Sequence, residues 1–240
     1  MKGIELDSLE PSKSLVDQAY EVILDALCDG TFKAGERLTQ EDIAAHLNVS
    51  RQPVTHALAV LKAQGFLTHS GRRGLMVTAI EPEFFRAIYQ FRSAIEPLAV
   101  RLSTPRLMNQ AILKCRSLVE HGGNMVVAAD SRACLQADMD FHSLIYDLSG
   151  NPIIGETMRL HWRHLRRAMG QVHLYPGMSI SVWQEHGRIL ESMIRGDADG
   201  AAELMRRHII DAYERVGKQI AGCTLHGAAI IYDMSSGAQS

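Results

Sequence analysis

Hydrophobic side chains in the first eighty residues recur at helical spacing and then at strand spacing. Between residues 15 and 27 they follow the N-cap candidate Ser14, which predicts a helix. A second short helix opens at Thr39, and a third runs from Arg51 to about Gln64. Two β-like runs, 66–70 and 75–79, flank the sequence GRRG and predict a hairpin with a cationic tip. This order of elements is that of a winged helix-turn-helix.

From Glu81 onward the apolar periodicity is helical, and no strand pattern competes with it. Pro97 lies inside the first helix and predicts a kink, whereas Gly122 and Gly123 predict a break between helices. The predicted helices cover about 82–103, 105–121, 131–149, 151–170, 179–195 and 197–220. We therefore expect a mainly α chain, in which a winged helix-turn-helix (1–80) precedes an antiparallel helical bundle (81–220) and a flexible tail (221–240).

Composition describes a globular chain and leaves its function open. The 240 residues are 46% hydrophobic, with a mean hydropathy of −0.06 and a net charge of −2. No apolar run reaches the ~18 residues of a membrane span, and the four cysteines form no CxxC pair, so a cytoplasmic location without a membrane partner is favoured. The net charge excludes only a wholly basic protein, because the acidic residues stop at Asp42 and return at Glu81.

The stretch without acidic residues coincides with the third helix and the hairpin, and it carries Arg51, Lys62, Arg72 and Arg73. Such a local basic face binds phosphates despite a negative net charge, because screening limits the field to about 8 Å. A helix that begins Ser50-Arg51-Gln52 presents its first side chains and backbone N–H groups to a major groove. The alternative is a generic three-helix module with a solvated surface.

Residues 14–79 resemble the GntR family of regulators. The resemblance is carried by GERLTQEDIA at 35–44, LNVSRQPV at 47–54, GFL at 65–67 and GRRG at 71–74. It implies operator binding to double-stranded DNA by a winged-helix domain, as a homodimer on a near-palindromic site. Thr55 departs from the family, which typically has an arginine there, although a threonine can still bond a phosphate or touch a thymine methyl. The expected DNA contacts are Arg37, Thr39, Ser50, Arg51, Gln52, Thr55, His56, Arg72 and Arg73.

Polar side chains interrupt the apolar stripes of three bundle helices. Asp138 and His142 lie four residues apart on an inner face, and His186 and His208 lie on the inner faces of two later helices. Burying one carboxylate and three imidazoles is costly unless they are satisfied together, and one divalent cation does this. Each residue also has a simpler interpretation, as a hydrogen-bonded core histidine or as an i,i+4 Asp–His pair.

Residues 82–215 resemble the FadR C-terminal (FCD) domain of one GntR subfamily. The resemblance is carried by YQFRSAIE at 89–96, Asp138, Phe141-His142, Gly150-Asn151-Pro152, Glu185-His186, Gly196-Asp197 and His208. In the metal-binding branch of this domain an Asp and three His surround zinc, nickel or a similar ion beside an effector pocket. The resemblance therefore implies that Asp138, His142, His186 and His208 are ligands of a divalent transition metal. The fatty-acyl-responsive branch lacks this set, which disfavours an acyl-CoA effector.

Arg92 faces inward between Ile88 and Ile95 and is the expected effector contact. A guanidinium at this place binds a carboxylate through two hydrogen bonds, and the alternative is a structural pair with Glu96. We expect a metabolite-responsive transcriptional regulator, a repressor, in which a small organic acid binds the metal and Arg92 and changes operator binding.

Two other functions stay open at this point. Three His and a carboxylate can activate a water in a metal-dependent enzyme that acts on a small carboxylate or phosphate substrate. An enzyme is nevertheless not expected, because no inward Glu or further His is placed as a general base. The other possibility is a constitutive DNA-binding protein with a purely structural metal.

Overall fold

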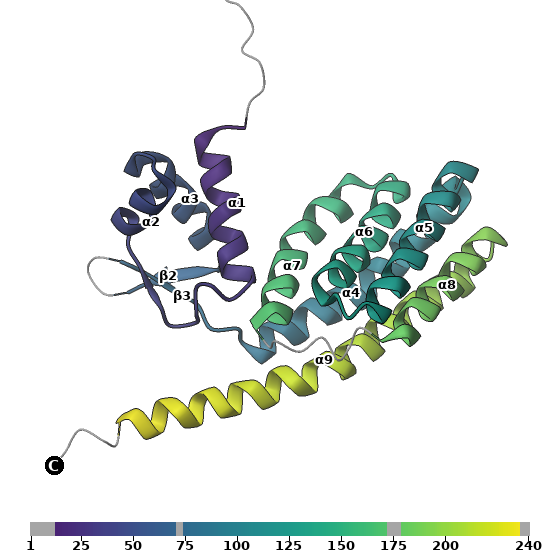
Figure 1. The fold of residues 1–240 in the computed structure, drawn as a ribbon. Helices are drawn as coiled ribbons and strands as arrows, with labels where there is room; N and C mark the ends of the chain where they lie inside the picture. Colours follow the sequence, from purple (N-terminus) through teal and green to yellow (C-terminus); the bar gives the residue numbers. More distant parts are fainter. Residues whose placement is uncertain (1–12, 71–73, 172–178, 236–240) are drawn as a thin grey trace, which may run out of the picture. The chain divides into compact units, whose positions relative to one another are not determined.

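The computed structural model describes residues 13–70, 74–171 and 179–235, which Figure 1 traces from purple to yellow. The chain divides into two compact units, residues 1–79 and 80–240. Arg72 and Arg73, at the predicted tip of the hairpin, lie outside the described residues. The two units are therefore described separately below.

The first unit contains the three predicted helices and the hairpin of a winged helix-turn-helix (Figure 1). Its strands form an antiparallel sheet in the order β1-β3-β2. The sequence did not predict β1, because a strand of two residues is too short to show a period. The elements are α1 (Leu15–Cys28), β1 (Arg37–Leu38), α2 (Gln40–Leu47), α3 (Arg51–Ala63), β2 (Leu67–His69) and β3 (Leu75–Val77).

Side-chain caps set the starts of α1 and α2. Ser14 Oγ accepts a hydrogen bond from the backbone N–H of Asp17, and Thr39 Oγ1 accepts one from that of Asp42. Ser50 is the N-cap residue of α3, but its side chain makes no capping hydrogen bond. The inner face of α3 is fully buried, which leaves its opposite face in solvent. The buried side chains of that face are Val54, Ala57, Leu58 and Leu61.

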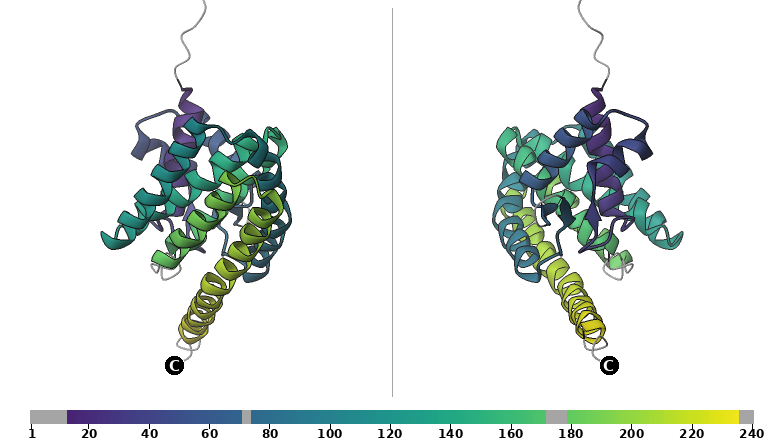
Figure 2. Two further views of the ribbon diagram at one scale, coloured as in Figure 1. Left: turned by 90° about the vertical axis from the view of Figure 1, so that its right-hand side faces the viewer. Right: turned by 90° about the vertical axis from the view of Figure 1, so that its left-hand side faces the viewer.

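Among the described residues of the second unit, all regular secondary structure is helical. Its core lies where α4, α6, α8 and α9 meet, since α4 packs against α6 and α9, and α8 packs against α5 and α9 (Figures 1 and 2). The inner faces of these helices therefore point at one another. The elements are α4 (Pro82–Ser103), the short 3₁₀ helix η1 (Thr104–Arg106), α5 (Asn109–Val127), α6 (Ser131–Ser149), α7 (Pro152–Gln171), α8 (Ile180–Ile194) and α9 (Ala198–Ser235).

Two predicted helix ends are wrong. The helix α5 does not break at Gly122 and Gly123 but continues to Val127. Gly122 is buried against the indole of Trp183, so this glycine allows close helix packing instead of forming a turn. The helix α9 does not end at residue 220 but continues to Ser235. Its interior glycines each cost about 1 kcal/mol relative to alanine, which weakens a helix without ending it.

We expect Gly122→Ala to destabilise the second unit by about 1–3 kcal/mol, because a Cβ at this position overlaps the Trp183 ring. Gly123→Ala is the matched control, since its Cβ would lie 3.6 Å from Ile180 Cδ1 in ordinary contact. That control should be neutral or slightly stabilising. Urea unfolding of the two variants makes the comparison, and equal midpoints would contradict the packing role of Gly122.

Candidate metal centre and DNA-binding surface

Three helices bring the four predicted metal ligands together in the core of the second unit. Asp138 and His142 lie one turn apart on α6, His186 lies on α8, and His208 lies on α9. One ligand atom from each lies within 4.8 Å of the others, and all four side chains are buried. The i,i+4 spacing places the two α6 residues on one face, and helix packing supplies the other two.

The ligand atoms converge on one small volume. The Nε2 atoms of His186 and His208 are 3.1 Å apart. Asp138 Oδ1 lies 3.4 Å from His186 Nε2 and 3.9 Å from His142 Nε2. The core therefore directs three imidazole nitrogens and one carboxylate oxygen toward a common point. This donor set is suited to zinc and nickel.

Carboxylates lie close to the Nδ1 atoms of two of the histidines. His208 Nδ1 donates to Glu185 Oε2 at 2.7 Å, and Arg215 donates to both oxygens of Glu185 at 3.1 Å. His142 Nδ1 lies 2.7 Å from Glu96 Oε2. Because a carboxylate only accepts, Nδ1 of His208 carries the proton and the lone pair of its Nε2 faces the ligand cluster. The contact of His142 with Glu96 is close but lacks hydrogen-bond geometry. The His208 contact is the arrangement by which proteins orient metal-binding histidines.

The protonation states of the cluster also fit a metal. Burial, and then the charges of His208 and His142, hold the pKa of His186 well below its usual range. The ring is therefore neutral, as a ligand must be. In addition, His142 Nε2 is buried and has no hydrogen-bond partner among the described residues. A buried acceptor without a partner costs about 1–3 kcal/mol, and a metal ion would satisfy it.

Arg92 forms the pair with Glu96 that the sequence left open. Its Nε donates to Glu96 Oε1 at 2.5 Å, and both side chains are buried. The guanidinium carbon lies 4.4 Å from the ring centre of Trp162 and 5.1 Å from that of Tyr89. Burial raises the pKa of Glu96. The nearby Arg92 and His142 lower this pKa by more than burial raises it, so the pKa of Glu96 lies below its usual range. Glu96 thus lies between Arg92 and His142, which belongs to the candidate ligand cluster.

The sequence predicted the four residues of the buried cluster but not the carboxylates that lie next to two of them. Glu185 is next to the ligand His186 in the sequence, yet it supports His208, which lies on another helix. Glu96 was considered only as a partner of Arg92. A sequence pattern detects neighbours on one helix, whereas both supporting contacts to histidine cross between helices.

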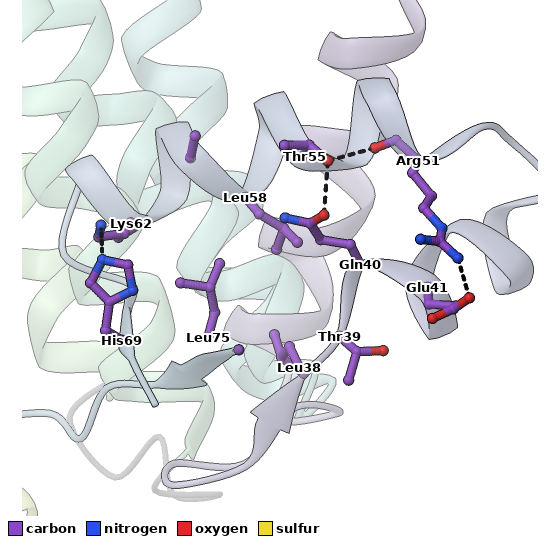
Figure 3. A pocket seen from close by; sticks show the side chains of 12 residues that line it. Leu38, Thr39, Gln40, Glu41, Arg51, Thr55, Leu58, Lys62, His69 and Leu75 are labelled. Atoms are coloured by element: carbon purple, nitrogen blue, oxygen red, sulfur yellow. Dashed lines mark hydrogen bonds and ion pairs between the residues drawn. The ribbon is translucent and has the colours of Figure 1, made fainter. Parts of the chain in front are cut away.

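In the first unit, a cleft of about 640 Å³ lies between α3, the start of α2 and the strands (Figure 3). Arg51, in the first turn of α3, reaches Glu41 of α2 and forms an exposed ion pair with it. Exposed pairs contribute only about 0–1 kcal/mol, so Arg51 can exchange Glu41 for a phosphate or a base at little cost. Gln52 and His56 are exposed, on the solvent side of the same helix.

Thr55 and Thr39 already make contacts within the first unit. The Oγ1 atom of Thr55 lies 2.8 Å from Arg51 O and 3.1 Å from Gln40 Oε1, so this hydroxyl faces α2 (Figure 3). The hydroxyl of Thr39 caps α2. Arg37 is exposed on β1. Gln40 was not expected, and its contact with Thr55 makes it a further candidate at this surface.

Comparison with known proteins identifies both units. The family described as "Bacterial regulatory proteins, gntR family" matches residues 15–77, and the FCD domain matches residues 87–211. The chain is a GntR-family regulator with an FCD domain. Both resemblances that the sequence indicated are thereby confirmed.

Relatives and solved structures agree with this assignment. The chain is 27% identical to the Nta operon transcriptional regulator of Aminobacter aminovorans, covering 77% of this chain and 93% of the relative. It is 25% identical to the transcriptional repressor NanR of Klebsiella aerogenes, covering 82% and 83%. The structure of McbR/YncC from E. coli superposes with a TM-score of 0.72 at 22% identity, covering 85% of this chain and 99% of that one, and so shows the same fold.

The chain is therefore a transcriptional regulator with an effector-binding C-terminal domain. Regulators of this family bind operator DNA and commonly dimerise. FCD domains bind metal, and the described residues contain a buried His/Asp cluster. The relatives named above are named as transcriptional regulators. Among the described helices, none is long and apolar enough to cross a membrane.

For the metal centre, we expect His208→Ala to lower the metal content of the purified regulator and its melting temperature, because one nitrogen ligand is lost and Glu185 loses a donor. His121→Ala, an exposed position on α5, is the control and should change neither. Elemental analysis and thermal unfolding make the comparison. Unchanged metal content in His208→Ala would contradict the ligand assignment.

For DNA binding, we expect Arg51→Ala to abolish specific operator binding while oligomeric state and thermal stability stay unchanged, since Arg51 is exposed and its pair with Glu41 is weak. Arg116→Ala is the control: it removes a similarly exposed ion-paired arginine from the second unit. A mobility-shift assay measures both variants. Operator affinity of Arg51→Ala equal to that of the control would remove Arg51 from the interface.

Proposed function

We propose that this regulator is a repressor whose FCD domain holds a divalent transition metal, zinc or nickel, and releases operator DNA when a small organic acid binds. It acts as a homodimer in the cytoplasm. The buried chain of contacts from Arg92 through Glu96 to His142 carries the proposal. It connects an anion-binding group to a metal ligand inside one helical core. The repressor name of the Klebsiella relative supports the direction of regulation.

The charges of the site favour an anionic effector. Asp138 and three neutral histidines around a divalent ion leave a net charge of about +1, and the charges of Arg92 and Glu96 cancel. The metal would supply open coordination positions for a carboxylate. Arg92, stacked between Trp162 and Tyr89, is held in place to bind a second carboxylate through its planar guanidinium.

Competition for Arg92 provides the coupling to DNA. An effector carboxylate bound to Arg92 weakens the contact of Arg92 with Glu96, and Glu96 then relaxes against His142 on α6. Both Arg92 and Glu96 lie on α4, which begins at Pro82, shortly after the wing strand β3 ends at Val77. A shift of α4 therefore pulls on the DNA-binding unit through a short connection. The differential effector affinity needed is about 1–3 kcal/mol.

The test is a mobility-shift assay on an operator selected from random DNA, titrated with a panel of mono-, di- and hydroxycarboxylic acids. We expect one class of acid to weaken operator binding about tenfold or more, within the usual range of allosteric coupling. Arg92→Lys should keep operator affinity without effector but lose most of the response, because lysine retains the charge opposite Glu96 without the planar fork.

Two outcomes would contradict this proposal. Full operator affinity with every acid would favour a constitutive DNA-binding protein with a structural metal. Conversion of an acid by the purified protein would favour a metal-dependent enzyme. Arg86→Lys, at an exposed arginine of the same helix, serves as the control and should respond like the unmodified chain.

A further inference from the structure

Two helices of the second unit are joined by a series of hydrogen bonds that ends at a candidate metal ligand. Arg215 of α9 donates from its two terminal nitrogens to the two carboxylate oxygens of Glu185 on α8, each at 3.1 Å. Glu185 Oε2 in turn accepts from Nδ1 of His208, which also lies on α9, at 2.7 Å. We call these three residues, Arg215, Glu185 and His208, the α8–α9 series.

The spacing on α9 places both partners of Glu185 on one face of that helix. His208 and Arg215 lie seven residues apart, which is close to two helical turns, so their side chains approach the same carboxylate of α8. The side chain of Glu185 is 15% exposed, whereas that of His208 is 3% exposed. Glu185 therefore has a way to water. Arg215 supplies two of the three hydrogen bonds that Glu185 makes with described residues, and so keeps it directed at His208.

A second series of the same residue types shows that this orientation is not general in the core. Arg92 donates to Glu96, and Glu96 lies close to His142, but that last contact lacks hydrogen-bond geometry. Neither ring nitrogen of His142 has a hydrogen-bond partner among the described residues. Of these two histidines, His208 is therefore the one whose ring is fixed by a hydrogen bond from outside the ligand cluster.

We propose that Arg215 is a positioning residue of the metal centre. By holding Glu185 in place, it fixes the Nδ1–H of His208 and directs Nε2 of that ring at the cluster, and it thereby sets the affinity of the regulator for its metal. Hydrogen bonds of this kind raise the basicity of a histidine ligand and fix its orientation. The proposal rests on the metal site of the proposed function and names a residue outside the ligand set that controls it.

The two series then have different tasks. Arg92 exchanges Glu96 for an effector carboxylate under the proposed function, and this exchange takes place on α4. The α8–α9 series contains no residue of α4, and the two-pronged contact of Arg215 with Glu185 does not take part in the exchange. The metal therefore stays bound through His208 while the contacts of α4 change.

The first test is a zinc titration of the metal-stripped, full-length regulator in competition with a chromophoric chelator. We expect Arg215→Gln to raise the zinc Kd about 10- to 100-fold, the usual effect of removing an outer partner of a metal ligand. Arg215→Lys should recover part of this loss, because lysine retains the charge beside Glu185 but not the planar fork. Arg207→Gln is the matched control, since Arg207 is an exposed arginine of α9 that pairs with Glu203 of the same helix.

A double-mutant cycle tests whether Arg215 acts through Glu185. Glu185→Ala removes the acceptor of His208 directly, and we expect it to weaken zinc binding at least as much as Arg215→Gln does. Arg215→Gln should have no further effect when residue 185 is already alanine, because the intermediate contact is gone. Additive losses in the double variant would overturn the route through Glu185.

Cobalt substitution separates positioning from a purely structural ion pair. We expect the d–d absorption bands of Co²⁺ bound to Arg215→Gln to differ from those of the unmodified chain and of Arg207→Gln, because the His208 nitrogen is no longer held in place. An ion pair that only joined α8 to α9 would lower the melting temperature of the metal-free protein and leave the cobalt spectrum and the zinc Kd unchanged. That result would overturn the proposal.

The outcomes also separate this proposal from the proposed function. Zinc binding by the unmodified chain, with equal zinc Kd in Arg215→Gln and Arg207→Gln, would overturn the role of Arg215 and leave the metal site intact. A lack of zinc and cobalt binding by the unmodified chain would overturn both. If circular dichroism shows that Arg215→Gln does not fold, Arg215→Lys and Glu185→Ala decide, and zinc affinity equal to the control in both would overturn the proposal.

Discussion

The structure of the second unit depends on the cost of burying charge in an apolar core. One carboxylate and three imidazoles lie among fully buried side chains, and an ion or ionisable group in such a place must be paired. The protein meets this constraint with Glu96 and Glu185, which lie next to two of the histidines. Arg92 and Arg215 in turn neutralise these carboxylates. The result is a network in which α4, α6, α8 and α9 are tied to one another through polar contacts.

This network explains why α4 is central to the regulator. The inner face of α4 contributes Arg92 and Glu96 to this network, and Glu96 contacts His142 of α6. Its N-terminal end follows shortly after the wing strand β3. Under the proposed function, a shift of this helix would carry a change at the Arg92–Glu96 pair toward the DNA-binding unit, because packed helices shift as units.

The sequence predicted the elements well where its signals are local. Helical spacing, the caps at Ser14 and Thr39, and the inward positions of Asp138 and His142 all follow from neighbours within one helix. The sequence predictions that were wrong or missing concern features that depend on contacts between different elements. Gly122 was interpreted as a helix break because glycine ends many helices, but its role depends on Trp183, which lies on another helix. The sequence pattern did not predict the strand β1, because this strand is defined only by its pairing with β3.

The sequence by itself determined the order of the helices and of the hairpin, the family of both units, and the four residues that form the buried His/Asp cluster, since periodicity and motifs are properties of the chain alone. Only the tertiary structure decided which carboxylate stands behind which histidine, that Arg92 is held by Glu96, and that Arg51 reaches Glu41. The two histidine–carboxylate contacts and the Arg51–Glu41 pair join different helices. Arg92 and Glu96 share α4, and their spacing allowed either a pair or an effector contact until packing placed both side chains in the same core.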